Sequence, residues 1–188
     1  MPSSVSRVTW GALMISLGLL FPVAFHTVGL GKAFLPMHVP VLLCGFLTDP
    51  ATGLLVGVLT PLLSALLTGM PLLAPPVAQA MMVELGIYGF LAAVLHRRYA
   101  VRIYPALLVT MFAGRLVYGV LGVLFFGLVG LARIPVLYPV SAGLVASVPG
   151  LLLQLVIVPP VVYAAERSLA TLRRHKAPRE ELGRQSRR

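Results

Sequence analysis

Six apolar stretches follow one another along this chain, and most are long enough to cross a lipid bilayer. A helix that spans about 30 Å of hydrocarbon needs about 20 apolar residues. Only 11% of the residues are charged and 59% are hydrophobic, whereas about a quarter of the residues in a soluble domain are charged. Too few polar side chains are left to cover a water-exposed surface. The sequence therefore predicts an integral membrane protein.

The predicted fold is all-α, a compact bundle of six transmembrane helices within residues 1–168. The predicted spans are 8–25, 35–47, 53–69, 77–95, 104–130 and 140–165. The second is short and opens with Pro36 and Pro40, as is typical of a tilted or partly re-entrant helix that lines a cavity. Residues 169–188 form a basic, charged tail that we expect to be disordered. No soluble domain remains, so we expect any ATPase to be a separate polypeptide.

The formal net charge of +10 reflects topology and not a nucleic-acid surface. Lys and Arg cluster at membrane ends on the cytoplasmic side, and six spans with both termini inside reproduce that pattern. The predicted inner segments then hold the basic tail and Arg7, Arg97, Arg98 and Arg102, while the outer loops hold only Lys32 and Arg133. We therefore predict that both termini are cytoplasmic.

Two ionisable residues lie deep within predicted spans, Glu84 in the fourth and Arg115 in the fifth. A charge at a helix centre costs about 2.5–3.5 kcal/mol on insertion scales, so each of these residues is expected to have an oppositely charged partner or a functional role. Either they form an interhelical ion pair, or they hold a polar ligand in a wet cavity; both roles are compatible. Further polar side chains on spans four to six are typical of a mostly apolar pocket, namely Tyr88, Tyr118 and Gln154.

Two histidines flank a glycine-containing segment between the first two predicted spans. His26 ends the first apolar run and His38 opens the second, with Gly29 and Gly31 between them. If both runs cross the membrane, the two imidazoles lie at one face and at similar depth, which predicts an outer mouth with a binding function. With Glu84 they also form an alternative transition-metal ligand set, since imidazole and carboxylate suit such ions.

Other motifs concern packing. Ala12 and Ser16 form a small-xxx-small pair that permits close helix approach, for internal packing or for a partner subunit. Three hydroxyl residues spaced four apart share one helix face and are read either as interhelical contacts or as ligand groups; they are Thr60, Ser64 and Thr68. Nucleotide-binding, His-Glu-x-x-His and nucleophile-elbow motifs are absent from the sequence, so we expect a non-catalytic protein without a cofactor.

Three segments carry a family resemblance. They are FHTVGLGKAFLPMHVPVLLCGFLTDPATGLLVGVLTPLLSALLTGMPLL at 25–73, MMVELGIYGFLAAVLHRR at 81–98 and AGRLVYGVLG at 113–122. Together they resemble the substrate-binding subunits (S components) of energy-coupling factor (ECF) transporters. The resemblance implies a vitamin-capturing subunit of the bacterial or archaeal cytoplasmic membrane, working with a transmembrane coupling subunit and two cytoplasmic ATPases.

The resemblance also implies roles for individual residues. Ligand contacts in that family come from the lid loop after the first span and from spans four to six. Here these are His26 and His38 at the lid, and Glu84, Tyr88, Arg115, Tyr118 and Gln154. The family's small-residue docking face on span one corresponds to Ala12 and Ser16.

Two alternatives stay open. The Met37-His38 string is similar to the Met-His start of cobalt and nickel S components, although there the histidine stands at the mature N-terminus. An internal histidine lacks the same amino-terminal ligand, so an organic micronutrient is the preferred substrate. A scaffold subunit of another membrane complex is the alternative from a different class.

Overall fold

Helices make up almost all of the backbone in the computed structural model. It describes the backbone of residues 4–27, 29, 36–73, 77–128 and 138–185, and the side chains of 6–25, 29, 36–73, 77–124 and 148–171. The elements in chain order are α1 (Ser4–Thr27), α3 (His38–Leu47), α4 (Pro50–Thr68), α5 (Val77–Ala93), the π-helical turn η1 (Val94–Arg98), α6 (Ile103–Leu128) and α7 (Tyr138–Gln185). Over these ranges there is no strand. The all-α prediction is confirmed.

Five helices are long and apolar enough to cross a membrane. Their spanning segments are Ser6–Phe25, Pro50–Thr68, Val77–Arg98, Ile103–Leu124 and Val148–Thr171. The second predicted span, already expected to be short, is the helix α3, which has only 10 residues and is therefore about 15 Å long. A turn at Pro36 and Met37 precedes its first residue. Within the described chain, the six predicted spans are thus five spanning-length helices and one half-length helix.

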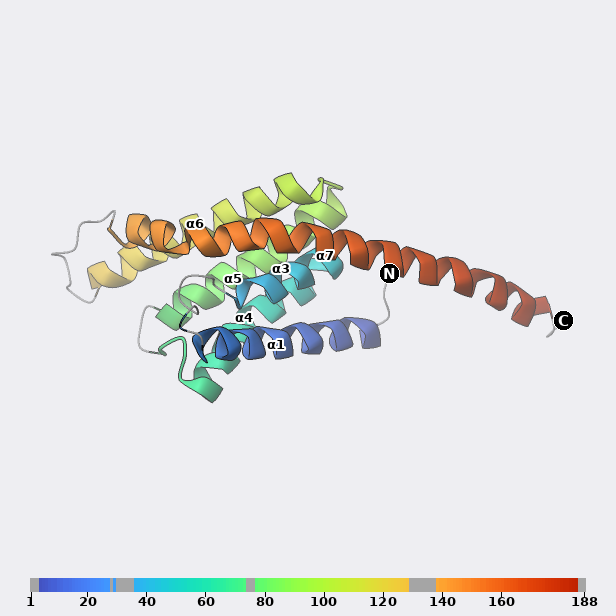
Figure 1. The fold of residues 1–188 in the computed structure, drawn as a ribbon, viewed down its shortest axis with the longest axis horizontal. Helices are drawn as coiled ribbons and strands as arrows, with labels where there is room; N and C mark the ends of the chain where they lie inside the picture. The colour runs from blue at the N-terminus through green and yellow to red at the C-terminus, as the bar shows by residue number, and fades with distance from the viewer. Residues whose placement is uncertain (1–3, 28, 30–35, 74–76, 129–137, 186–188) are drawn as a thin grey trace.

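The half-length helix α3 is the centre of the bundle. All ten of its residues are buried, and it packs against α1, α4, α5 and α7. Figure 1 shows α3 enclosed by the longer helices. A helix that is apolar on every side is stable only when neighbours cover it all round, which explains why α3 lies inside although it cannot span the bilayer.

Glycines let α3, α4 and α5 approach closely. A Cβ added at Gly89 on α5 would overlap the Gly53 carbonyl of α4, and one added at Gly57 would overlap the Leu85 carbonyl. Gly45 of α3 also faces Gly89, whose carbonyl oxygen would lie 2.6 Å from an added Cβ. Small residues allow such backbone contact between membrane helices. The close approach of the three helices fixes the position of α5, which carries Glu84.

Polar contacts tie several helix ends together at one end of the bundle. Arg97, in η1, donates from Nη1 to the carbonyls of Phe46 (3.3 Å) and Leu47 (3.0 Å) at the end of α3. The Asp49 carboxylate caps α4 and lies 3.8 Å from Nη1 of Arg7 on α1. Helix ends leave backbone carbonyls without intrahelical partners, so the Arg97 guanidinium satisfies two groups that α3 leaves open.

The same end holds a contact between η1 and α7. His96 Nε2 lies 3.0 Å from Glu166 Oε1, and Nδ1 lies 2.8 Å from the Val101 carbonyl oxygen. The start of α1 and the late part of α7 lie toward this end of the molecule (Figure 1). Which side of the membrane this end faces stays a prediction.

Helix α7 continues to Gln185 and extends beyond the rest of the bundle (Figure 1). The division into a membrane domain and a tail stays a prediction. The α4 side chains expected to make interhelical contacts or to bind a ligand place their hydroxyls on their own helix and on the loop after it, while the Thr60 side chain also packs against Gly18 of α1. Thr60 donates to Val56, Ser64 to Met70 and Thr68 to Ser64.

Candidate binding site in the bundle core

Glu84 and Arg115 meet inside the bundle, across α5 and α6. Arg115 Nη1 lies 3.3 Å from Glu84 Oε1, and the side chains are 9% and 1% exposed. A lone charge inside a membrane bundle is costly, and an opposite charge beside it offsets part of that cost. The predicted ion pair is therefore confirmed as a contact. A role in holding a ligand stays a prediction.

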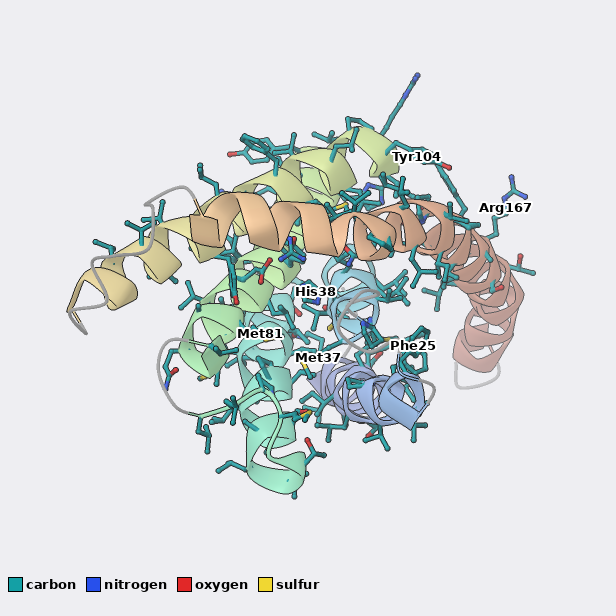
Figure 2. The ribbon with its side chains drawn as sticks, turned by 60° about the vertical axis from the view of Figure 1, so that its left-hand side comes forward. Phe25, Met37, His38, Met81, Tyr104 and Arg167 are labelled. Carbon is teal, nitrogen blue, oxygen red and sulfur yellow. The ribbon has the colours of Figure 1, made fainter. Side chains whose placement is uncertain are left out.

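His38 is the third member of this cluster. Its Nε2 lies 3.7 Å from Glu84 Oε2, and its side chain is 1% exposed. Figure 2 shows His38 among the helices, whereas Tyr104 and Arg167 lie at the periphery. We expected His38 at an outer mouth, level with His26. His38 is the first residue of the half-length α3 and is buried in the bundle. Its depth in the membrane stays a prediction, and the side chain of His26 lies outside the described residues.

Tyr88 packs beside the cluster. It lies one turn after Glu84 on α5, is fully buried, and its ring makes an edge contact with the His38 imidazole, with centroids 5.4 Å apart. Its hydroxyl donates to the Met111 carbonyl of α6 at 3.3 Å. Gly114 gives the ring its space, because a Cβ there would overlap the ring atoms. Tyr88 therefore fixes α5 against α6 next to the ion pair.

Several buried polar atoms have no hydrogen-bond partner among the described residues. They include Arg115 Nε and Nη2, Glu84 Oε1, both amide atoms of Gln154, and Thr110 Oγ1. A buried polar group without a partner costs about 1–3 kcal/mol. Gln154 is fully buried on α7, which packs against α6. A polar interior with unmet hydrogen bonds is the chemistry expected where a polar ligand binds.

The other predicted site residues are less closely joined to the cluster. Tyr118 is half-buried, one turn after Arg115 on α6. Ala12 and Ser16 lie on an exposed face of α1, and the Ser16 hydroxyl bonds the Ala12 carbonyl at 2.9 Å. Ala12 also borders a shallow apolar groove of about 280 Å³ between α1 and α4. Ala12 and Ser16 belong to the surface of the bundle, whereas Tyr118 lies near the charges of Glu84 and Arg115.

Neither Thr110 nor the contact between Gly114 and Tyr88 was predicted from the sequence. Hydroxyl residues are common in apolar spans, so the sequence does not distinguish Thr110 from the others. Its burial in the structure does. Gly114 precedes Arg115 on α6 and accommodates the Tyr88 side-chain ring. Within the part of the chain that the structure describes, no group of three His, Cys, Asp or Glu residues could hold a metal ion.

The fold and this core define a multi-pass membrane protein with a polar interior. A model of the family described as ECF transporter, substrate-specific component, matches residues 6–162, so the chain belongs to this family. It is therefore a substrate-binding transporter subunit, and family membership implies association with ECF coupling and ATPase subunits. No curated protein and no solved structure matches the chain.

Proposed function

We propose that this chain captures a vitamin or a related small organic micronutrient on the outer side of a bacterial or archaeal cytoplasmic membrane. It delivers the solute with a transmembrane coupling subunit and two cytoplasmic ATPases. The buried polar cluster carries this proposal. Glu84, Arg115 and His38 lie together in the bundle, beside guanidinium nitrogens that have no partner in the described chain.

The cluster supports binding more than a purely structural role. An ion pair that served packing alone would best have all of its hydrogen bonds satisfied, because the low dielectric makes each unmet group costly. Here Nε and Nη2 of Arg115 are unmet, and the described part of the bundle holds the buried Gln154 with no partner for either amide atom. A polar solute that supplied these hydrogen bonds would be stabilised in the bundle.

The deciding experiment is native mass spectrometry of the purified protein released from mild detergent. A bound organic micronutrient would support the proposed capture role and identify the substrate. A bound cobalt or nickel ion would contradict the organic substrate and point to His38 and Glu84, which are 3.7 Å apart, as ligands. An empty protein that copurifies with no coupling or ATPase subunit would favour a scaffold role.

The variant Arg115→Ala tests the site itself. We expect it to reach the membrane but to lose the copurified solute, because the guanidinium is the strongest donor in the cluster. Arg102→Ala is the matched control, since Arg102 is exposed in the segment before α6. Unchanged ligand content in Arg115→Ala would rule out its contact role.

The surface of α1 is the proposed docking face for the coupling subunit. Ala12 and Ser16 are exposed, and small exposed residues let a second helix approach closely. The groove beside Ala12 is lined almost wholly by apolar groups, which suits a membrane helix as its occupant.

A further inference from the structure

One edge of the Arg115 guanidinium is buried and unused. Nη1 faces Glu84 at 3.3 Å, while Nε and Nη2 have no hydrogen-bond partner among the described residues. The side chain is only 9% exposed. Nε and Nη2 lie on the same edge of the planar group and donate in parallel. This edge therefore offers two parallel N–H donors inside the bundle.

We propose that this edge binds a carboxylate of the transported solute, so that the substrate is an organic acid. This rests on the proposed capture function and specifies its substrate class. Two parallel N–H donors match the two oxygens of a carboxylate, which is why arginine predominates where carboxylates are recognised in two-point contacts. A neutral amide offers one oxygen and a nitrogen that cannot accept, so it fits the same edge poorly.

The Glu84–Arg115 contact occupies only part of the guanidinium. The Glu84–Arg115 contact uses one nitrogen, and its 3.3 Å exceeds the 2.7–2.9 Å typical of a strong charge-assisted bond. Glu84 also has a second neighbour, because His38 Nε2 lies 3.7 Å from its other oxygen. His38 can thus hold Glu84 in place when an incoming carboxylate takes part of the guanidinium charge.

The test compares an acid with its own amide on the purified wild-type protein. The probes are the copurified solute and its amide, together with the pairs nicotinate and nicotinamide, and biotin and biotinamide. We expect the acid that binds to do so about 10- to 100-fold more tightly than its amide, as for a hydrogen bond to a charged group. Equal binding of acid and amide would overturn the proposal.

The variant Arg115→Lys separates this contact from folding. Lysine keeps a positive charge beside Glu84 but lacks two parallel N–H donors. We therefore expect a folded protein that has lost most of its preference for the acid over its amide. Arg102→Lys, changed at an exposed position, should keep the full preference. A folded Arg115→Lys protein with undiminished preference would contradict the proposal.

The outcomes also separate this inference from the capture function. A tightly bound solute that lacks a carboxylate would refute the organic-acid inference and leave the capture function intact. A wild-type protein that retains no solute and binds none of the probes would count against the capture function, and the inference would fall with it.

Discussion

The Gly114 backbone lies against the Tyr88 ring so closely that a single added methyl group would overlap the ring. The contact joins α5 to α6 next to the Glu84–Arg115 pair. Because Tyr88 also bonds the Met111 carbonyl and touches His38, a shift of its ring would disturb the whole cluster.

Gly114→Ala should therefore destabilise the protein and weaken solute binding. Overpacking of this kind costs about 1–3 kcal/mol, measured as a lower midpoint of thermal unfolding in detergent. Gly11→Ala is the control, because its added Cβ would lie 3.5 Å from the nearest atom, Val56 Cγ2, an ordinary contact. Equal stability of the Gly114 and Gly11 variants would contradict this account of the ring contact.

Gly89→Ala should be more damaging, because the obstacle there is backbone. The added Cβ would overlap the carbonyl of Gly53 on α4, which cannot rotate away as a side chain can. We expect a loss of more than about 2 kcal/mol, or loss of folded protein from the membrane. Gly86→Ala, on the same helix, would meet the movable side chains of Val58 at 3.0 Å and Leu54 at 3.2 Å, and should cost less. The reverse order of stabilities would refute this explanation.

The sequence predicted the ion pair better than it predicted the position of His38. Two ionisable residues in apolar spans need partners, and Glu84 and Arg115 are opposite in charge, so their contact follows from elementary electrostatics. His38 opens the second predicted span after the glycine-containing segment, which suggested an outer mouth. In the structure His38 is buried beside Glu84, because α3 has only 10 residues and longer helices pack around it.

Close glycine contacts also escape a reading of the sequence alone. Gly53 is the first residue of the third predicted span; in the structure it lies on α4 and touches Gly89 of α5. The spacing of Gly53 and Gly57 is the small-xxx-small pattern, so this signal was available. The pairing of Gly114 with the Tyr88 ring could not be predicted in this way, because spacing along one helix does not identify the contact residue on another helix.

Substitution of Ala12 by leucine should impair assembly with the coupling subunit. The larger side chain would stand on an exposed face of α1 and hold a partner helix away. We expect at least about tenfold less copurified coupling subunit, equivalent to about 1.4 kcal/mol, with unchanged solute binding. Ala164→Leu, at an exposed site on α7, is the control. Full assembly of the Ala12 variant would place the docking face elsewhere.

Arg97→Gln should destabilise the end of α3. The guanidinium donates to the Phe46 and Leu47 carbonyls, and its loss leaves both without that partner, at a cost of about 1 kcal/mol. Arg98→Gln removes one positive charge from the same segment at an exposed position, so any effect on membrane orientation is matched. Thermal unfolding of the two variants side by side checks this, and identical midpoints would exclude a capping role for Arg97.

The cap of α4 should make stability depend on pH. Partial burial raises the pKa of the Asp49 carboxyl. Hydrogen bonds from the Thr52 hydroxyl and amide, together with the nearby Arg7 charge, lower that pKa by more than burial raises it, so the pKa lies below its usual range. A carboxyl with a lowered folded-state pKa stabilises the fold above its unfolded pKa of about 3.9, and this contribution is lost as the pH falls through the folded-state pKa.

Asp49→Asn isolates that contribution, because asparagine also caps helices but carries no charge. At pH 7 the wild-type protein should be more stable by about 0.3–1 kcal/mol, the usual value of an acidic group at a helix N-terminus. The difference should shrink toward zero below the usual aspartate range, where the Asp49 carboxyl becomes protonated. Thermal unfolding of both proteins at each pH cancels the acid response that the two proteins share. A gap that stays constant down to the lowest pH would show that the cap acts through its shape alone and that the ionised form of Asp49 contributes nothing.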